Sequence, residues 1–210
     1  MTSLRLPLVL NLDRVYLSDE QFYQLCINNP EIPLERDRQG ALIVMSPVGG
    51  DSGSYELELG TDLTIWNRQT LSGKVFSSST LFKLPGGGDR SPDAAWIELS
   101  RWQNLTPEQR QKFPPIAPDF VMELRSRSDR LETLRNKMQE YIDSGVRLGW
   151  MFNPHDQQVE IYRPGQPPEI RQLPTILDGE SVLPGFVLQV DRFSEEDTDD
   201  PIEFEQTENP

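Results

Sequence analysis

The sequence predicts an α+β domain, in which a mixed β-sheet carries helices packed on its faces. The chain has 210 residues, enough for one well-filled hydrophobic core. Its predicted elements follow the order helix, several strands, helix, strands, and its 18 prolines and 14 glycines supply turns between them. There is no internal repeat and no linker long enough to divide the chain. We therefore expect one domain over residues 1–193, followed by a tail over residues 194–210.

The first predicted elements are a helix and a hairpin. Residues 18–29 begin with Ser18, a favourable helix cap, and their apolar residues recur at helical spacing. Residues 31–46 hold two arms on either side of a polar turn that ends in Gly40, which predicts a β-hairpin.

The next segment predicts a second helix and three short strands. Residues 53–66 place apolar side chains on one helical face. Residues 73–84 contain two short strand-like runs, and the glycines at 86–88 predict a flexible loop. Residues 91–97 are predicted to form another strand.

The second half of the chain begins with a short polar helix near residues 106–112. Residues 119–124 are almost wholly apolar and predict a buried strand. A helix then begins after Ser128 or Asp129, either of which can cap it, and ends at about Ser144 before a glycine.

The C-terminal part predicts a β-hairpin from residues 147–152 and 158–163. Between its arms lies a turn that holds His155, the single histidine. The last apolar segment, residues 182–190, is expected to close the fold. With one histidine and no serine elbow, a Ser/His/Asp hydrolase is not expected.

The charge of the chain limits how it can bind nucleic acid. The formal net charge is −14, and residues 194–210 contribute eight acids and no base, so we expect a solvated, disordered tail there. The rest of the chain is still acidic, with 26 acids against 20 bases. A protein held to DNA mainly by its own field would be basic. Binding of DNA must therefore depend on a local site or on a partner.

Cysteine content and hydropathy predict a cytoplasmic protein without a membrane span. Cys26 is the single cysteine, so it has no internal disulfide partner, and it is expected to be a small buried residue. No apolar run has the length of a transmembrane helix. The apolar residues 6–10 include a proline and lack a cleavage site, so we do not interpret them as a signal peptide.

Two predicted strands each carry an acid in an apolar setting. Strand alternation places Asp93 on one face with Ala95 and Ile97. Glu123 stands at the end of an apolar run and shares a face with Arg125. A buried carboxylate needs a cation or hydrogen bonds. Either Arg125 provides an ion pair for Glu123, or a metal ion does.

A magnesium ion is the alternative to Arg125 as the partner of the buried carboxylate. Mg²⁺ accepts one or two carboxylates, a carbonyl oxygen and several waters, and Asp93, Glu123 and the backbone oxygen of Leu124 supply such a set. Lys137 lies at the edge of the apolar stripe of the following helix, from which its amine can reach the strand end. Such groups can activate a water and stabilise a phosphate in a hydrolytic transition state.

Simpler interpretations exist for each of these residues. Asp93 can form a turn after a proline, Glu123 can pair with Arg125, and Lys137 can be a solvated helix residue. Asp119 also follows a proline, but it lies four residues before Glu123, about 13 Å along the strand, too far to share a metal ion with it.

Several motifs, in this order and spacing, give the chain a resemblance to a known family. They cover most of residues 15–190 and include the stretches at 42–47, 91–96, 118–126, 137–141 and 145–150. The chain resembles the Uma-type restriction-endonuclease-like domains of the PD-(D/E)XK nuclease superfamily, which are common in cyanobacteria. The acidic tail is not covered.

The resemblance implies a restriction-endonuclease-like core with Asp93 and Glu123 as metal ligands. It also implies that the lysine of the superfamily motif is displaced onto the following helix, at Lys137. Arg125 occupies the usual lysine position, so two candidates remain for one role, although an arginine cannot give up its proton. The superfamily often has an acid on the first core helix. Glu58 is the candidate here, with Glu56 and Asp62 as rivals.

The functional expectation is a Mg²⁺- or Mn²⁺-dependent endonuclease that hydrolyses phosphodiester bonds in DNA. The alternative is a nuclease-fold binding or assembly module with weak or no catalysis, which the acidic charge and the arginine at position 125 favour. A homodimer is also expected, because two active sites are useful for cutting both strands. The apolar segments at residues 150–152 and 182–190 are the expected interface.

Overall fold

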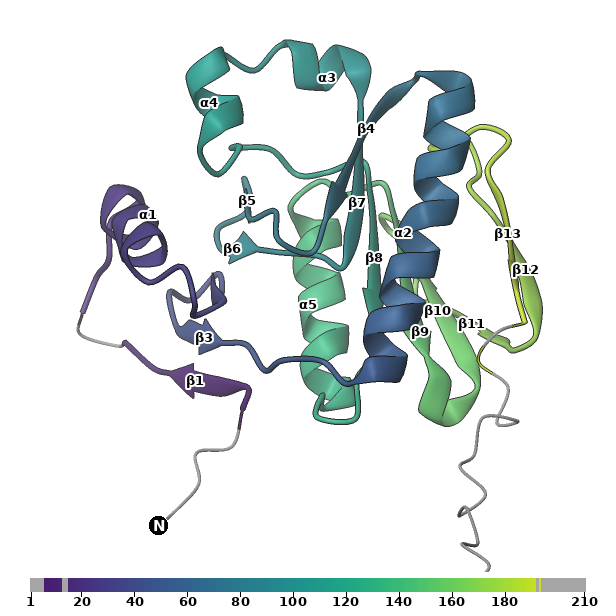
Figure 1. The fold of residues 1–210 in the computed structure, drawn as a ribbon, viewed down its shortest axis with the longest axis horizontal. Helices are drawn as coiled ribbons and strands as arrows, with labels where there is room; N and C mark the ends of the chain where they lie inside the picture. Colours follow the sequence, from purple (N-terminus) through teal and green to yellow (C-terminus); the bar gives the residue numbers. More distant parts are fainter. Residues whose placement is uncertain (1–5, 13–14, 192, 194–210) are drawn as a thin grey trace, which may run out of the picture.

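The computed structural model describes residues 6–12, 15–191 and 193 of the chain (Figure 1). Its centre is a six-stranded sheet in which one pair of neighbours is parallel and the others are antiparallel. In spatial order the strands are β11 (Glu169–Gln172), β10 (Gln158–Tyr162), β9 (Leu148–Asn153), β8 (Phe120–Leu124), β7 (Ala94–Glu98) and β4 (Gly73–Ser77). The parallel pair is β8 and β9. The predicted mixed sheet is confirmed.

Two helices cover the faces of this sheet. Helix α2 (Gly50–Thr70) packs on one face, where its buried Leu63 and Trp66 join the strand residues Trp96 and Phe120 in one core (Figure 1). The hairpin of β12 (Thr175–Asp178) and β13 (Val187–Val190) adds to that core. Helix α5 (Leu131–Asp143) packs on the other face in a second core.

A second, smaller sheet stands beside α5 (Figure 1). Its strands, in spatial order, are β1 (Leu8–Leu10), β3 (Leu42–Val44), β2 (Leu34–Arg36), β6 (Asp89–Arg90) and β5 (Phe82–Lys83). Helix α1 (Asp19–Asn28) closes a third apolar cluster, in which Phe22 contacts Leu42 and Leu81. The remaining elements are the short helices α3 (Leu99–Gln103), α4 (Pro107–Gln111) and η1 (Pro154–Asp156).

Most of the elements expected from the sequence are present. Ser18 caps α1 in a reciprocal capping box with Gln21. The predicted hairpins are β2–β3 and β9–β10, and both are antiparallel. The helix predicted over residues 53–66 is longer, because Gly49 begins it and Leu71, in the left-handed conformation at φ 54°, ends it.

Other details differ from the prediction. Neither Ser128 nor Asp129 caps α5; Arg130 holds the N-cap position without a side-chain bond, while Asp129 accepts a hydrogen bond from the Ser126 amide. Strands β6, β11 and β12 were not predicted. They are short, and two of them are mostly exposed, so they lack the apolar run that marks a strand.

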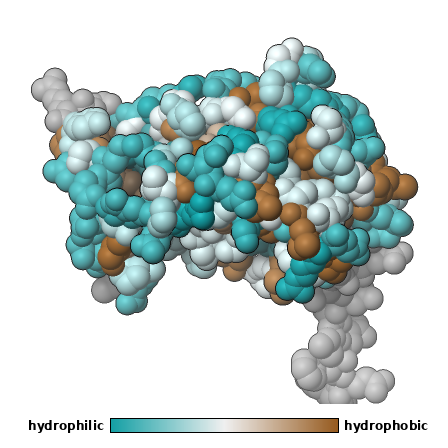
Figure 2. All heavy atoms as spheres, turned by 90° about the horizontal axis from the view of Figure 1, so that it is seen from above, coloured by the Kyte–Doolittle hydropathy of each residue, from teal (hydrophilic) through white to brown (hydrophobic). Residues whose placement is uncertain are grey.

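The segments expected to form a dimer interface lie inside the molecule. Trp150, Met151 and Phe152 are fully buried, and the segment 182–190 contributes Leu183 and Leu188 to the core of the same chain. On the face shown in Figure 2, hydrophobic side chains occur in scattered patches among hydrophilic ones. The choice of this interface was therefore wrong, and the homodimer stays a prediction without an assigned surface.

Two further expectations concern the ends of the chain and the membrane. The expected disordered tail lies outside the described residues. Residues 8–10 form β1, which pairs with β3 in the smaller sheet. Within the described ranges, no helix combines the length and the apolar character that crossing a bilayer requires.

Candidate active site

Asp93 and Glu123 lie side by side on adjacent strands. Asp93 directly precedes β7, and the antiparallel register that pairs Ala94 with Met122 places Asp93 opposite Glu123. The carboxylate Oδ2 of Asp93 accepts a hydrogen bond of 2.6 Å from the Leu124 amide. Two acids thirty residues apart in sequence therefore meet at the end of one pair of strands.

The alternation of side chains along β7 and β8 turns both acids toward α5. Phe120 and Met122 point into the core on the α2 side. Ala95 and Val121, one residue out of step, join the core that contains α5 residues. Glu123 shares the parity of Val121, and Asp93 that of Ala95. The facing expected from the sequence is confirmed.

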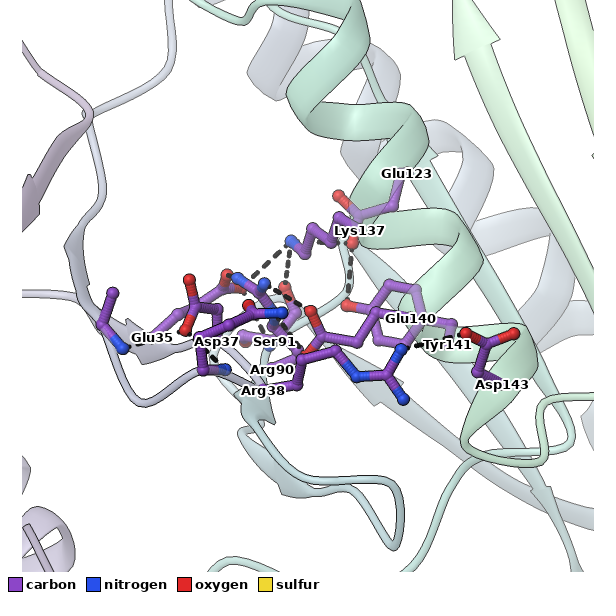
Figure 3. Close-up of polar contacts among 12 residues, drawn as sticks. Glu35, Asp37, Arg38, Arg90, Ser91, Glu123, Lys137, Glu140, Tyr141 and Asp143 are labelled. Atoms are coloured by element: carbon purple, nitrogen blue, oxygen red, sulfur yellow. Dashed lines mark hydrogen bonds and ion pairs between the residues drawn. The ribbon is translucent and has the colours of Figure 1, made fainter. Parts of the chain in front are cut away.

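Lys137 of α5 extends into the site, between Glu123 and Glu35 (Figure 3). Its Nζ lies 2.8 Å from Glu123 Oε1 and 3.0 Å from Glu35 Oε1, and it donates to the carbonyl oxygen of Ser91 at 3.2 Å. One turn further along α5, the Tyr141 hydroxyl donates to Glu123 Oε1 at 2.9 Å. Helical spacing thus aims both side chains at one carboxylate.

A second cation extends this cluster into a buried ionic network. Arg90 pairs with Glu35 at 3.0 Å and with Glu140 at 2.7 Å. The charged members of the network are almost inaccessible, since Glu35, Glu123 and Glu140 are 2%, 3% and 5% exposed. The two cations join the smaller sheet to α5.

Burial and the neighbouring charges shift the pKa values of these groups. Burial, together with the negative charge of Glu123, holds the pKa of Asp93 well above its usual range. Burial also raises the pKa of Glu123, although Lys137 opposes this rise. For Lys137, burial disfavours the ammonium, but the charges of Glu123 and Glu35 outweigh it and raise its pKa. The lysine is therefore a cation at neutral pH.

The acids line a cavity of about 890 Å³ between the smaller sheet and α5. Asp93, Glu123 and Lys137 are among its lining residues. On the side of the smaller sheet the lining mixes apolar residues such as Val9 and Ile43 with charged ones such as Glu35 and Arg90. The carboxylates thus face a cavity with room for a small ion and for part of a larger substrate, although Glu123 itself is only 3% exposed.

The donor set suits a hard divalent cation. The second oxygens of Asp93 and Glu123 have no hydrogen-bond partner within the part of the chain that the structure describes. The Leu124 amide points at Asp93, and because both backbone groups of a strand residue face the same side, its carbonyl does so too. The described residues contain no group of three or more His, Cys, Asp or Glu side chains suited to a metal. Two carboxylates, one carbonyl and waters still meet the needs of Mg²⁺.

Arg125 does not belong to this cluster. Its guanidinium contacts Asn153 Oδ1 at 3.1 Å and Asp156 Oδ2 at 3.2 Å, near the turn between β9 and β10. The expected pairing of Arg125 with Glu123 is wrong, because β8 ends at Leu124 and Lys137 takes the Glu123 carboxylate instead. Of the two candidates for the lysine role, only Lys137 reaches the acids.

Glu58, the acid of α2 that was expected in the site, also lies elsewhere. Glu58 is exposed and is not among the residues that line the cavity. Glu56, its rival, lines the cavity, and its negative charge adds to the rise in the pKa of Asp93. Glu56 and Glu58 border opposite sides of the stripe of α2 that buries Leu59, Leu63 and Trp66, so the sequence did not distinguish between them.

The sequence did not indicate three charged residues of the network: Glu35, Arg90 and Glu140. Glu35 lies in a three-residue strand and Glu140 on a helix rich in charged residues, where solvated side chains are the usual case. Glu140 does follow Lys137 by three residues, which places both near one helix face, and this was the available signal. Asp119, in contrast, pairs with Arg101 at 2.8 Å at the opposite end of β8.

Comparison with known proteins points to nucleases. The family model Uma2, described as "Putative restriction endonuclease", matches residues 19–191. A crystal structure of "a putative nuclease belonging to DUF820" from Anabaena variabilis ATCC 29413 is similar, with a TM-score of 0.65 and 18% identity over 76% of this chain and 88% of that chain. Its likeness supports the nuclease fold. Among curated proteins, none matches the sequence significantly.

Proposed function

This chain belongs to the Uma2 family of restriction-endonuclease-like proteins, and on this basis we propose that it is a metal-dependent nuclease that hydrolyses phosphodiester bonds in DNA. The observation that carries the proposal is the meeting of Asp93, Glu123 and Lys137 in one cavity. Two carboxylates beside a buried lysine are what phosphodiester hydrolysis requires: a cation site and a fixed positive charge.

In this proposal Asp93, Glu123 and the Leu124 carbonyl would hold Mg²⁺ or Mn²⁺. The cation would supply Lewis acidity toward the phosphate and make the attacking water more acidic. Tyr141 fixes the orientation of the Glu123 carboxylate through its hydrogen bond of 2.9 Å. Lys137 would position the attacking water and stabilise the negative charge that develops on the phosphate. In this step the water oxygen bonds to phosphorus and gives up a proton to solvent, while the bond to the leaving oxygen breaks.

A cleavage assay tests the proposed function. Plasmid, single-stranded and branched DNA are incubated with the protein and Mg²⁺ or Mn²⁺. Asp93→Asn is expected to slow cleavage by about a hundredfold or more, since loss of groups that support a metal already costs up to that factor. Asp143→Asn is the control, because Asp143 also lines the cavity but pairs with Arg38 at an exposed position. Equal activity of the wild type and Asp93→Asn would contradict the proposal.

The alternative function is a binding module with the same fold and no useful turnover. The ion pair between Lys137 and Glu123 favours it, since it neutralises Glu123 without a metal. The acidic charge of residues 1–193 also favours it. The same assay separates the two functions: no cleavage of any substrate by the wild type, with either cation, would support the binding module.

A further inference from the structure

Glu35 belongs to the smaller sheet, yet its carboxylate reaches the lysine of α5. Glu35 Oε1 lies 3.0 Å from Lys137 Nζ and accepts a hydrogen bond of 3.0 Å from the Ser91 amide. Its second oxygen accepts from Arg90, also at 3.0 Å. Donors on three separate residues therefore fix a side chain that is only 2% exposed. Such a carboxylate is a rigid anchor for its neighbours.

The Lys137 ammonium has three N–H donors and three acceptors around it. Only one acceptor, Glu123, belongs to the proposed cation site, at 2.8 Å. The other two, Glu35 and the Ser91 carbonyl, lie away from it (Figure 3). Lys137 and a divalent cation are both positive, so they compete for the Glu123 carboxylate.

We propose that Glu35 is a positioning residue. When a divalent cation binds Glu123 and displaces Lys137 from that carboxylate, Glu35 keeps the Lys137 ammonium in place. Held by Glu35 and Ser91, the ammonium stays beside the site and has one N–H free for the substrate. Without the charge of Glu35, the contacts described would leave Lys137 with Glu123 as its carboxylate partner. The lysine would then compete more strongly with the cation for the Glu123 carboxylate. This inference rests on the metal dependence of the proposed function.

A titration with Mn²⁺ alone tests the inference without any cleavage. The affinity is measured by calorimetry for the full chain, for Glu35→Gln and for Glu140→Gln. Glu140 is the matched control, because it is similarly buried and pairs with Arg90, but makes no contact with Lys137 among the contacts described. Both variants lose one negative charge of the same network and keep the shape of the side chain.

Glu35→Gln is expected to weaken Mn²⁺ binding by about tenfold, the lower end of the range for residues that orient metal ligands. Glu140→Gln is expected to change it by no more than about twofold, since Glu140 pairs with Arg90 and not with Lys137. In the cleavage assay, Glu35→Gln should lower kcat and leave the KM for DNA nearly unchanged.

The possible outcomes separate the inference from the proposed function. Equal losses of Mn²⁺ affinity in Glu35→Gln and Glu140→Gln would overturn the role of Glu35 and leave the nuclease proposal intact. A loss of Mn²⁺ affinity in Glu35→Gln but not in Glu140→Gln, in a protein that cleaves no DNA, would support the role of Glu35 and count against the nuclease proposal. A wild type that binds no Mn²⁺ would overturn both. Thermal melts check folding. If Glu35→Gln unfolds, Glu35→Asp and Glu140→Asp replace the pair: the shorter carboxylate at position 35 should lose its 3.0 Å contact with Lys137, so Glu35→Asp should weaken Mn²⁺ binding more than Glu140→Asp, and equal effects would overturn the role of Glu35.

Discussion

At the scale of single residues, the balance of charge decides what the site can do. Glu123 and Glu35 share Lys137, and Glu35 and Glu140 share Arg90. Asp93 has no ion-pair partner within the described residues, and its carboxylate bonds instead to the Leu124 amide. Because no neighbouring cation in the described part of the chain pairs with it, Asp93 is the residue of the site whose buried charge a bound divalent cation would stabilise most.

Replacing Asp93 by asparagine should stabilise the metal-free protein at neutral pH. Because the pKa of Asp93 is raised in the folded state by burial and by Glu123, the folded state holds its proton more tightly than the unfolded state. Stability is therefore lost as the pH rises from about 4 through the raised pKa. Asp93→Asn removes this loss and should therefore be more stable than the wild type at pH 7.

Urea unfolding in EDTA, from pH 4 to pH 8, measures this effect. The gain should shrink toward pH 4, where the folded-state carboxyl is protonated and the unfolded-state carboxyl, with its ordinary pKa of 3.8, is about half protonated. Asp143→Asn should give no gain, since hydrogen bonds from Gln139 and Arg38 lower the pKa of Asp143. A loss of stability in Asp93→Asn at pH 7 would contradict this prediction. It would show that interactions of the ionised Asp93 in the folded state outweigh the cost of burying its charge.

Replacing Tyr141 by phenylalanine should destabilise the fold through Glu123. The hydroxyl is buried and donates to Glu123 Oε1 at 2.9 Å, so its removal leaves a buried carboxylate with one donor fewer. The expected cost is about 1.5–3 kcal/mol, as for hydrogen bonds to charged groups. Chemical denaturation compares it with Tyr23→Phe, which changes a partly exposed ring. Equal effects in both variants would argue against this role.

At the scale of elements, one helix and one loop bring the network together. Helix α5 carries Lys137 and Tyr141 on the side that faces the sheet, where Met138 packs in the core. The loop between β5 and β6 brings Arg90 to Glu140, and Gly88 allows the close approach. Gly88 adopts φ 87°, and a Cβ there would collide with the Glu140 carboxylate and lie 3.1 Å from the Arg36 carbonyl.

Gly88→Ala should therefore cost more than a glycine replacement that adds strain alone. Gly165 also has a positive φ, of 70°, but an added Cβ there meets nothing within 4 Å. Gly165→Ala should cost about 1 kcal/mol from backbone strain. Gly88→Ala should cost about 3 kcal/mol, because the clash with Glu140 adds to the strain. Thermal or urea unfolding of both variants checks this, and equal costs would contradict the close packing of the loop against α5.

At the scale of the whole molecule, a buried ionic network joins two sheets around one cavity. Lys137 and Arg90 bind Glu35 of the smaller sheet, and Asp93 and Glu123 come from the larger one. The cavity between them is accessible, but the body around it is acidic, with 26 acids against 20 bases over residues 1–193. A polyanion approaching the site therefore meets overall repulsion.

Deleting residues 194–210 should strengthen DNA binding at low salt. This segment carries eight acids and no base, and its removal lowers the repulsion of phosphate. Fluorescence anisotropy with labelled DNA and Ca²⁺ in place of Mg²⁺ measures the affinity. The gain should vanish at about 1 M salt, where the Debye length falls to about 3 Å.

A full-length variant separates charge from length in this experiment. With all eight acids of the tail replaced by their amides, it should bind DNA as tightly as the truncated chain. A gain in the truncated chain alone would assign the effect to the length of the segment.

The sequence by itself determined the class of the fold and indicated Asp93 and Glu123 as candidate acids. Periodicity is a local property, so it identified the helices, the hairpins and the faces of Asp93 and Glu123. It did not determine the partners of the charges. Arg125 pairs with Asp156, Lys137 spans Glu123 and Glu35, and Glu56 rather than Glu58 lines the cavity. Tertiary structure decided these, because an ion pair depends on distances between segments far apart in the chain, and the residues of each segment do not encode those distances.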